Sequence, residues 1–264
     1  MAILEVCTGS LLSVQHAALG GAQRVELCSG LDEGGLTPSI GLIQAALQVE
    51  GPRKHVLIRP RGGDFLYTEA EQDVIVDDIF AARRAGVDGV VIGALTADGD
   101  VDVEACERFV EAAKGEYVDF AEGDLDEAYF LPPVSVTFHR AFDLCRDAEA
   151  ALEALIRLGV DRVLTSGQRA TAEEGIEVLR KLQQQAVGRI VIMPGCGVND
   201  VNCVRVVKEA GVAEIHASAR SVWPTQMRFR HEGVSMGKPG SDEYATKETD
   251  PNIVRRIVEQ IAEL

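Results

Sequence analysis

Residues 84–93 read RAGVDGVVIG: the end of a helical pattern, a glycine and then a short β-branched run. The same order recurs in ALGGAQRVELC at 18–28, RLGVDRVLTSG at 157–167 and EAGVAEIHAS at 209–218. In each phrase a glycine stands where the preceding helix should end, a position that favours the left-handed conformation. These glycines are Gly20, Gly86, Gly159 and Gly211. We interpret the four phrases as junctions of a repeating helix-to-strand unit.

Outward from these junctions, short β-branched runs alternate along the whole chain with longer segments of helical spacing. This alternation predicts βαβ units around a parallel sheet. The predicted strands are Ile3–Cys7, Arg24–Cys28, His55–Arg59, Gly89–Ile92, Ser135–His139, Arg162–Thr165, Ile190–Met193 and Glu214–Ala217. We expect a single (β/α)8 TIM barrel over residues 1–264, with a last helix at Asn252–Ala262. A doubly wound open sheet is the alternative fold.

Two segments interrupt the alternation. Residues 116–131 are acidic and aromatic and precede the fifth strand, so they should lie at the end of the barrel opposite the active-site loops. Residues 222–249 follow the last strand without an obvious helix of their own. A loop of this length is either a lid over the barrel mouth or a packing loop, and both interpretations stay open.

Composition excludes several classes of function. A formal net charge of -16 without any basic run argues against a nucleic-acid partner, since phosphate binding needs clustered Lys and Arg. No apolar run reaches the roughly 18 residues of a membrane span. The opening MAILEVCTGS has neither a basic flank nor a cleavage site, so we expect a cytoplasmic protein. Six cysteines without a C-x-x-C pair then predict reduced thiols.

Polar residues gather after the predicted strands, where barrel enzymes build their active sites. Side chains alternate along a strand, so Glu5 shares a face with Cys7, and Glu26 with Cys28. Three further pairs share faces in this way: Arg59 with Arg61, Thr137 with His139, and His216 with Ser218. If these faces point inward, their charges must pair, meet water or meet a ligand. For an enzyme, the candidate catalytic residues are Glu26, His139 and Asp143.

An anion site is predicted from two regions. Arg59 and Arg61 in RPRGGDF carry guanidinium groups beside glycines that allow close backbone approach. The phrase MPGCGV offers backbone N–H groups at the start of a helix, and the loops after strands seven and eight of a barrel often hold phosphate. The residues assigned to this second region are Gly195, Gly197, Ser218 and Arg220.

The charged candidates also have a purely structural interpretation. In that alternative, Glu5 and Glu26 pair with Arg59 inside the barrel. His139 is then a hydrogen-bonded histidine of the core.

Five loop phrases carry a family resemblance. In chain order they are RVELCSGLDEGGLTPS, IRPRGGDF, TFHRAFD, RVLTSGQ and MPGCGV. Together they resemble the CutC family of copper homeostasis proteins, and the resemblance runs from the first predicted strand to the last helix. It implies a (β/α) barrel, which agrees with the alternation of strands and helices. It also implies a cytosolic location and, as for some members of the family, copper binding.

The copper ligands that the resemblance implies are Cys7 and Cys28, at the ends of the first two strands. Cu(I) is soft and prefers thiolate ligands, and a reducing cytosol maintains both the ion and the thiols. Inward layers of a barrel come from alternate strands, so these two thiols should be staggered rather than level. They either share one Cu(I) ion or fill the barrel as small residues.

Two functions follow from these observations. The first is a copper homeostasis protein that binds Cu(I). The second is a barrel enzyme acting on a small anionic carbonyl compound, phosphorylated or not, with Arg59 and Arg61 on the anion and His139 or Glu26 moving a proton. Soft-metal binding has no use for two arginines and an anion cradle, and this mismatch keeps the second function open as the alternative to the first. A homo-oligomer is compatible with such a barrel, although the sequence reveals no interface.

Overall fold

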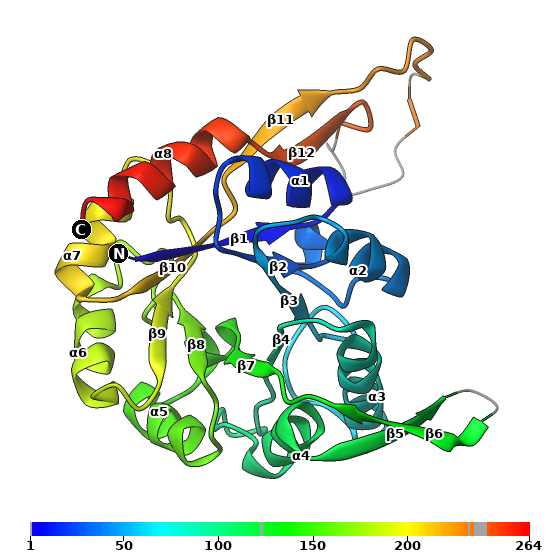
Figure 1. The fold of residues 1–264 in the computed structure, drawn as a ribbon. Coiled ribbons are helices and arrows are strands. Elements are labelled where there is room, and N and C mark those ends of the chain that lie inside the picture. The colour runs from blue at the N-terminus through cyan, green and yellow to red at the C-terminus, as the bar shows by residue number, and fades with distance from the viewer. Residues whose placement is uncertain (1, 122–123, 232, 235–241) are drawn as a thin grey trace.

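A computed structural model describes residues 2–121, 124–231, 233–234 and 242–264. Its main sheet holds eight parallel strands in the order β10-β1-β2-β3-β4-β7-β8-β9. The strands are β1 (Ile3–Thr8), β2 (Arg24–Leu27), β3 (Arg53–Leu57), β4 (Gly89–Ile92), β7 (Ser135–Phe138), β8 (Arg162–Thr165), β9 (Val191–Pro194) and β10 (Glu214–Ala217). Helices surround this sheet as an outer ring (Figure 1). The predicted (β/α)8 barrel is confirmed.

The helices lie between the strands, as the alternation predicts. They are α1 (Leu11–Leu19), α2 (Ile40–Leu47), α3 (Glu69–Ala85), α4 (Val103–Lys114), α5 (Ala148–Arg157), α6 (Ile176–Ala186), α7 (Cys203–Ala210) and α8 (Pro251–Ala262). Local chemistry explains where they begin: Thr68 and Glu71 form a capping box at α3. The Asp250 carboxylate accepts a hydrogen bond from the Asn252 N–H at the start of α8.

The glycines before the strands serve two different purposes. Gly86, Gly159 and Gly211 have positive φ, as expected of a left-handed helix end. The expectation is wrong for Gly20, whose φ is -77°. A Cβ on Gly20 would lie 2.5 Å from Cβ of Val254, so glycine is required there because α8 packs closely against the end of α1.

The barrel is nearly closed. Backbone ladders join each strand to the next from β10 round to β9, whereas β9 and β10, whose residues are all described, share no ladder. Gly195 directly follows β9, and a Cβ there would come within 3.3 Å of the His216 side chain on β10. The two strands therefore meet at a seam that is packed but not hydrogen-bonded.

Alternate residues of each strand face two different environments. Leu4, Val25 and Val90 point outward and are fully buried against the helices in the main hydrophobic core. The inward residues are mostly polar, and the largest group of apolar atoms there is a small cluster around Cys7, Cys28, Leu57 and Val91. The inside of this barrel is consequently held together by polar contacts.

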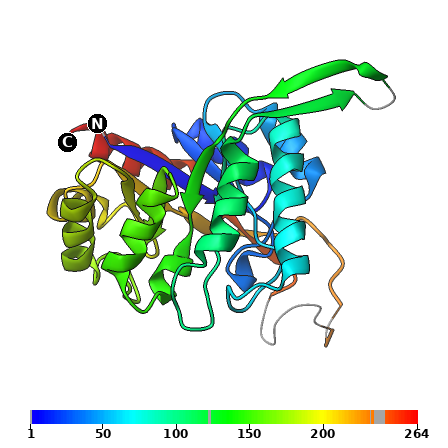
Figure 2. The same ribbon diagram turned by 90° about the horizontal axis from the view of Figure 1, so that it is seen from below.

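Two ribbons extend beyond the barrel. Strands β5 (Tyr117–Ala121) and β6 (Asp124–Leu131) form an antiparallel hairpin between α4 and β7. Strands β11 (Arg220–Pro224) and β12 (Ala245–Thr249) form a second antiparallel pair after β10. Figure 2 shows the hairpin and the segment after β11 leaving opposite ends of the barrel. Part of the expected 222–249 loop, residues 232 and 235–241, lies outside the described residues.

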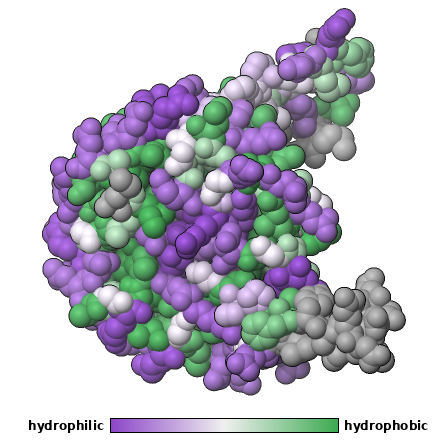
Figure 3. Space-filling model, viewed as in Figure 1, coloured by the Kyte–Doolittle hydropathy of each residue, from purple (hydrophilic) through white to green (hydrophobic). Residues whose placement is uncertain are grey.

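Hydrophilic residues are prominent on one face of the molecule (Figure 3). On the face in Figure 3, hydrophilic residues cover most of the area, with hydrophobic residues scattered among them. This agrees with the 26% of charged residues in the chain. Among the described residues, no helix has the length and apolarity needed to cross a membrane.

Candidate functional site

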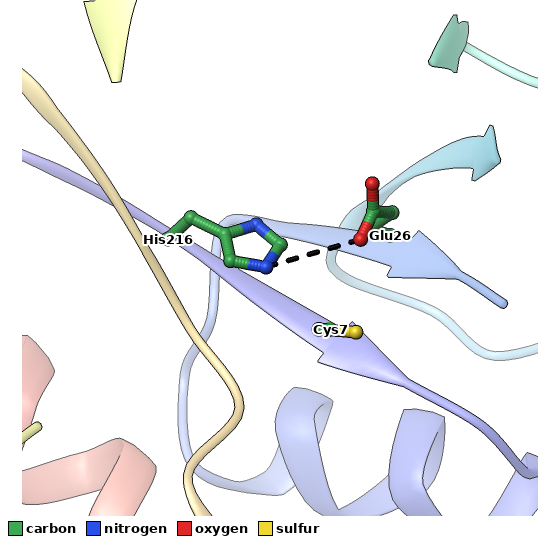
Figure 4. A group of neighbouring side chains, drawn as sticks. All are labelled: Cys7, Glu26 and His216. Carbon is green, nitrogen blue, oxygen red and sulfur yellow. Dashed lines mark ion pairs between the residues drawn. The ribbon is translucent and has the colours of Figure 1, made fainter. Parts of the chain in front are cut away.

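Four side chains meet at the ends of neighbouring strands: Cys7, Glu26, Cys28 and His216, here called the mouth cluster. Cys7 is opposite Glu26 in the β1–β2 ladder, and His216 projects from β10 on the other side of β1. One ligand atom each of Cys7, Glu26 and His216 lie within 4.8 Å of one another. Figure 4 shows these three side chains pointing toward a common point.

The second thiol completes the cluster from one residue beyond β2. Cys28 Sγ lies 3.8 Å from Cys7 Sγ and 3.4 Å from the Glu26 carboxylate. Both thiols are buried. Cys7 is level with Glu26 in the ladder rather than with Cys28, so the two thiols are staggered, as expected, and their sulfurs are nevertheless in contact.

Protonation is distributed unevenly within the mouth cluster. The hydrogen bond with Cys28, aided by His216 and opposed by burial, holds the pKa of Cys7 well below its usual range. The same hydrogen bond, together with burial, raises the pKa of Cys28. Burial lowers the pKa of His216, but its contacts with Cys7 and Glu5 outweigh this and raise it. The cluster thus favours a Cys7 thiolate beside a His216 imidazolium.

Glu26 behaves differently from the other carboxylates in the barrel. Burial, reinforced by the negative charge on Cys7, raises the pKa of Glu26 to about 8. Its Oε2 lies 3.8 Å from Nε2 of His216. At neutral pH Glu26 is accordingly a neutral acid that can give up a proton close to the thiols.

Below the mouth cluster lies a second group of charged residues: Glu5, Arg24, Arg162 and Glu214, here called the lower ion network. Arg24 pairs with both carboxylates, and Arg162 binds Glu214 through two further bonds of 2.5 and 2.9 Å. Glu5 also accepts a 2.8 Å hydrogen bond from Nδ1 of His216. Each charge in this network has an opposite partner.

The lower ion network corrects one structural alternative. Glu5 and Glu26 were candidates to pair with Arg59, but Glu5 pairs with Arg24 and His216. Arg59 follows β3, which ends at Leu57, and its guanidinium points to the loops instead. The pairing was mispredicted because β3 begins and ends two residues earlier than the sequence pattern suggests.

His139 lies on the far side of the mouth, just after β7. Its Nδ1 accepts a 3.2 Å hydrogen bond from the Ala141 N–H, and its Nε2 is buried with no hydrogen-bond partner among the described residues. The ring sits against Gly93, where a Cβ would approach to 2.4 Å, and 4.8 Å from the Phe65 ring. Burial and the nearby Arg59 charge lower the pKa of His139 to about 3, so the imidazole is neutral.

Arg59 is buried, with only 6% of its surface exposed. Its guanidinium donates to the backbone carbonyls of Glu33, Gly35 and Gly63, and stacks 4.9 Å from the centre of the Phe65 ring. Within the described chain it forms no salt bridge. Backbone carbonyls therefore fix the position of the guanidinium, but no described carboxylate neutralises its positive charge.

Three members of the mouth cluster, Cys7, Glu26 and His216, line a cavity of about 130 Å³ together with His139 and Arg59. Its walls come from Cys7, Glu26, Gly34, Leu57, Arg59, Phe65, His139, Arg140, Leu164 and His216. The cavity therefore joins the Cys7 thiol and the Glu26 carboxyl to the buried side chains of Arg59 and His139, which follow β3 and β7.

Two other predicted residues are already occupied by neighbours. The Asp143 carboxylate accepts from Thr165 Oγ1 and from the Ser166 N–H, and pairs with Arg140. Arg61 lies on the surface and pairs with Glu71 at 2.5 Å and with Asp64 at 3.2 Å. These two residues lie outside the cavity wall.

The residues predicted for an anion cradle are spread over the rim. Gly195 packs against His216, and Gly197 has a positive φ beside Thr171. Arg220 lines a separate cleft of about 600 Å³ between the β11–β12 pair and the loops after β1 and β2. Ser218 is half-buried just after β10.

The geometry also brings forward residues that were not among the predicted site residues. His216 is the third member of the potential metal-binding group, and its inward parity was the signal available in the sequence. Arg24, Arg162 and Glu214 were not singled out, because their pairings connect strands on different sides of the barrel.

Comparisons with known proteins agree with the fold. The family model of the CutC family matches residues 2–221. The chain is 47% identical over 260 residues to a protein of Bacteroides fragilis named family protein CutC, covering 98% of this chain and 96% of that protein. It is 45% identical over 256 residues to the copper homeostasis protein cutC homolog of Homo sapiens, covering 97% and 87%. A solved structure of CutC from Streptococcus agalactiae superposes with a TM-score of 0.72 at 32% identity, covering 83% of this chain and 99% of that one.

Proposed function

Because this chain belongs to the CutC family, we propose that it is a cytoplasmic copper homeostasis protein that binds Cu(I) through Cys7 and Cys28. The name of the human relative refers to copper homeostasis. All six cysteines are free thiols, the state that a reducing compartment maintains. Both the copper ligands and the location are parts of this proposal.

One observation carries the proposal: the two Sγ atoms of Cys7 and Cys28 lie 3.8 Å apart at the barrel mouth. Soft thiolates are the ligands that select Cu(I). His216 and Glu26 lie within reach of the same point, so an imidazole nitrogen is available as a third ligand. Glu5 orients that ring by accepting a hydrogen bond from Nδ1, so Nε2 becomes available to the ion once the imidazolium gives up its Nε2 proton.

In the mouth cluster one thiol is deprotonated and the other keeps its proton, so a metal ion can bind both sulfurs by displacing that proton. The pKa of Cys7 is held low, so this sulfur is ready to bind, whereas the raised pKa of Cys28 keeps its proton in the metal-free protein. A bound ion would take the place of that proton between the two sulfurs. Copper binding should therefore release a proton and become tighter as pH rises.

The test is an anaerobic titration of the reduced, metal-free protein with Cu(I) against a competing chelator. We expect one Cu(I) per chain in the wild type and a loss of affinity by orders of magnitude in the Cys7→Ser, Cys28→Ser variant. The matched control is Cys145→Ser, Cys196→Ser, which changes two thiols outside the mouth cluster and should bind as the wild type does. Unchanged affinity in the first variant would rule the proposal out.

A second candidate function is an enzyme that acts on a small anionic carbonyl compound. It is favoured by the cavity of about 130 Å³, which joins a low-pKa thiol, a neutral carboxylic acid and a buried guanidinium. Glu26 would supply the proton and Arg59 the positive charge. Incubation of small 2-oxo acids with the metal-free protein, followed by NMR, should then show loss of substrate signals that Glu26→Gln abolishes. Unchanged spectra across the series would reject it.

A further inference from the structure

His139, one of the residues that line the cavity, has a hydrogen-bond donor that lacks an acceptor among the described residues. Nδ1 of His139 accepts from the Ala141 N–H, so this nitrogen carries no hydrogen and the proton of the neutral ring must be on Nε2. Nε2 is buried and has no partner among the described residues. A buried N–H without an acceptor destabilises a fold, and such a group in a native protein calls for an explanation.

Arg59 adds an uncompensated positive charge to the same wall. Backbone carbonyls of Glu33, Gly35 and Gly63 take three of its five N–H groups and fix the guanidinium, but no described carboxylate pairs with it. The contrast within the barrel is direct, because Arg24 contacts both Glu5 and Glu214. A buried charge without a counterion is costly unless a ligand supplies one.

The volume limits the ligand. A cavity of about 150 Å³ accommodates benzene, a molecule of six heavy atoms, and this cavity measures about 130 Å³. A ligand, or the part of a ligand inside the cavity, therefore has about six heavy atoms. The ligand must present oxygen acceptors and a negative charge, since the two open groups are a neutral N–H donor and a cation.

From these three observations we infer that the cavity is a binding site for a small carboxylate of about six heavy atoms, held by Arg59 and His139. The carboxylate oxygens accept from His139 Nε2 and offset the Arg59 charge, and the remainder of the ligand extends toward Cys7 and Glu26. This inference names a ligand class for the second candidate function and does not rest on copper binding.

The experiment is a calorimetric titration of the reduced, metal-free protein with pyruvate, lactate and acetate in turn. Pyruvamide, which has the size of pyruvate without the charge, is the matched ligand control. At least one of the three acids should bind saturably with one site per chain, and pyruvamide should not. No saturable binding by any of them up to about 10 mM, which corresponds to a binding free energy weaker than about -3 kcal/mol, would overturn the inference.

Two variants at one position separate ligand binding from folding. His139→Asn keeps an acceptor near Nδ1 for the Ala141 N–H but removes the Nε2 donor, so carboxylate affinity should fall by at least about tenfold. His139→Gln places an amide N–H near the position of Nε2 and should recover part of the affinity. Equal carboxylate affinity in the wild type and His139→Asn, with Arg59→Gln also unchanged, would contradict the inference.

The Cys7→Ser, Cys28→Ser variant distinguishes this inference from the copper proposal. It should lose Cu(I) and keep the carboxylate, because His139 and Arg59 lie on the opposite wall of the cavity. Loss of carboxylate binding in a folded Cys7→Ser, Cys28→Ser variant would show that the thiols are the binding groups, against the inference.

Discussion

The lower ion network and the mouth cluster lie one above the other inside the same barrel, yet they treat buried charge differently. In the lower ion network each arginine meets a carboxylate, and Arg24 meets two. At the mouth, the lowered pKa of Cys7 favours a thiolate, Glu26 is held neutral, and His139 and Arg59 each keep a buried nitrogen without a hydrogen-bond partner among the described residues. Paired charges stabilise the lower part of the barrel, whereas the groups without a partner lie at the proposed ligand site.

The largest expected effect comes from breaking the lower ion network. Arg24→Met removes the residue that joins Glu5 to Glu214 and leaves buried carboxylates with fewer partners. The free energy of unfolding should fall by about 3–5 kcal/mol, measured by urea denaturation. Adding Glu5→Gln should recover part of the loss. A loss below about 1 kcal/mol would show that this network is dispensable and would remove the contrast with the mouth.

A smaller effect is expected from Glu26→Gln, which tests the mouth cluster instead of the lower ion network. The change keeps the shape of the side chain but removes the carboxylate beside Cys28 and His216. Cu(I) affinity should fall by about 10–100-fold, the usual cost of losing a group that orients metal ligands, with little change in unfolding. Glu153→Gln, whose carboxylate pairs with Arg189 on the surface, is the control. Unchanged Cu(I) affinity in Glu26→Gln would leave this carboxylate without a role at the metal.

The pH dependence of stability reports on the buried histidines. Burial lowers the pKa of His139 to about 3 and that of His55 to about 4, from a usual 6.5. Between the lowered pKa of each histidine and 6.5, the unfolded chain binds more protons than the folded one. The neutral histidines therefore contribute fully to the free energy of unfolding above pH 6.5. As pH falls below 6.5 this contribution is lost, by about 1.4 kcal/mol per pH unit for each histidine.

His139→Asn tests this linkage by removing one of the two groups. The slope of unfolding free energy between pH 6 and pH 4 should become shallower by up to about 1.4 kcal/mol per unit. Urea denaturation at several pH values measures it, and His55→Asn should act in the same direction. Parallel curves for the wild type and His139→Asn would show that His139 is protonated in the fold, and the argument for its Nε2 would weaken.

The smallest effect is expected from Arg61→Ala. Arg61 pairs with Asp64 and Glu71 on the surface, outside the cavity. Exposed pairs contribute little, so the free energy of unfolding should change by less than about 1 kcal/mol. Cu(I) affinity and carboxylate affinity should both stay at wild-type values. A clear loss of either affinity would show that Arg61, in the loop after β3 and outside the cavity, also belongs to the binding site.

The barrel was predictable because its signal is local. Each junction phrase contains a helix end, a glycine and a strand, so alternation alone indicates the fold. Parity within a strand also placed Glu5 with Cys7, and Glu26 with Cys28, on shared faces. These inferences need only neighbours along the chain.

The rest of the site depends on contacts that the sequence does not encode locally. Arg24 and Glu214 meet only because the sheet curves round to bring β10 beside β1. Arg59 was assigned to an anion from its charge, but its three carbonyl partners come from loop conformations that no periodicity specifies. The missing acceptor at His139 could be recognised only once every neighbour was in place.

The barrel should open locally at the seam between β9 and β10 sooner than elsewhere in the sheet. Ladder bonds protect amide hydrogens from exchange with solvent, and local opening is easiest where such bonds are few. The edges of β9 and β10 that face each other have no ladder between them, so their amides should exchange deuterium before those of β2 and β3. His216 is carried by one of these edges. We therefore expect the strand that bears the imidazole of the mouth cluster to open more readily than β2 and β3.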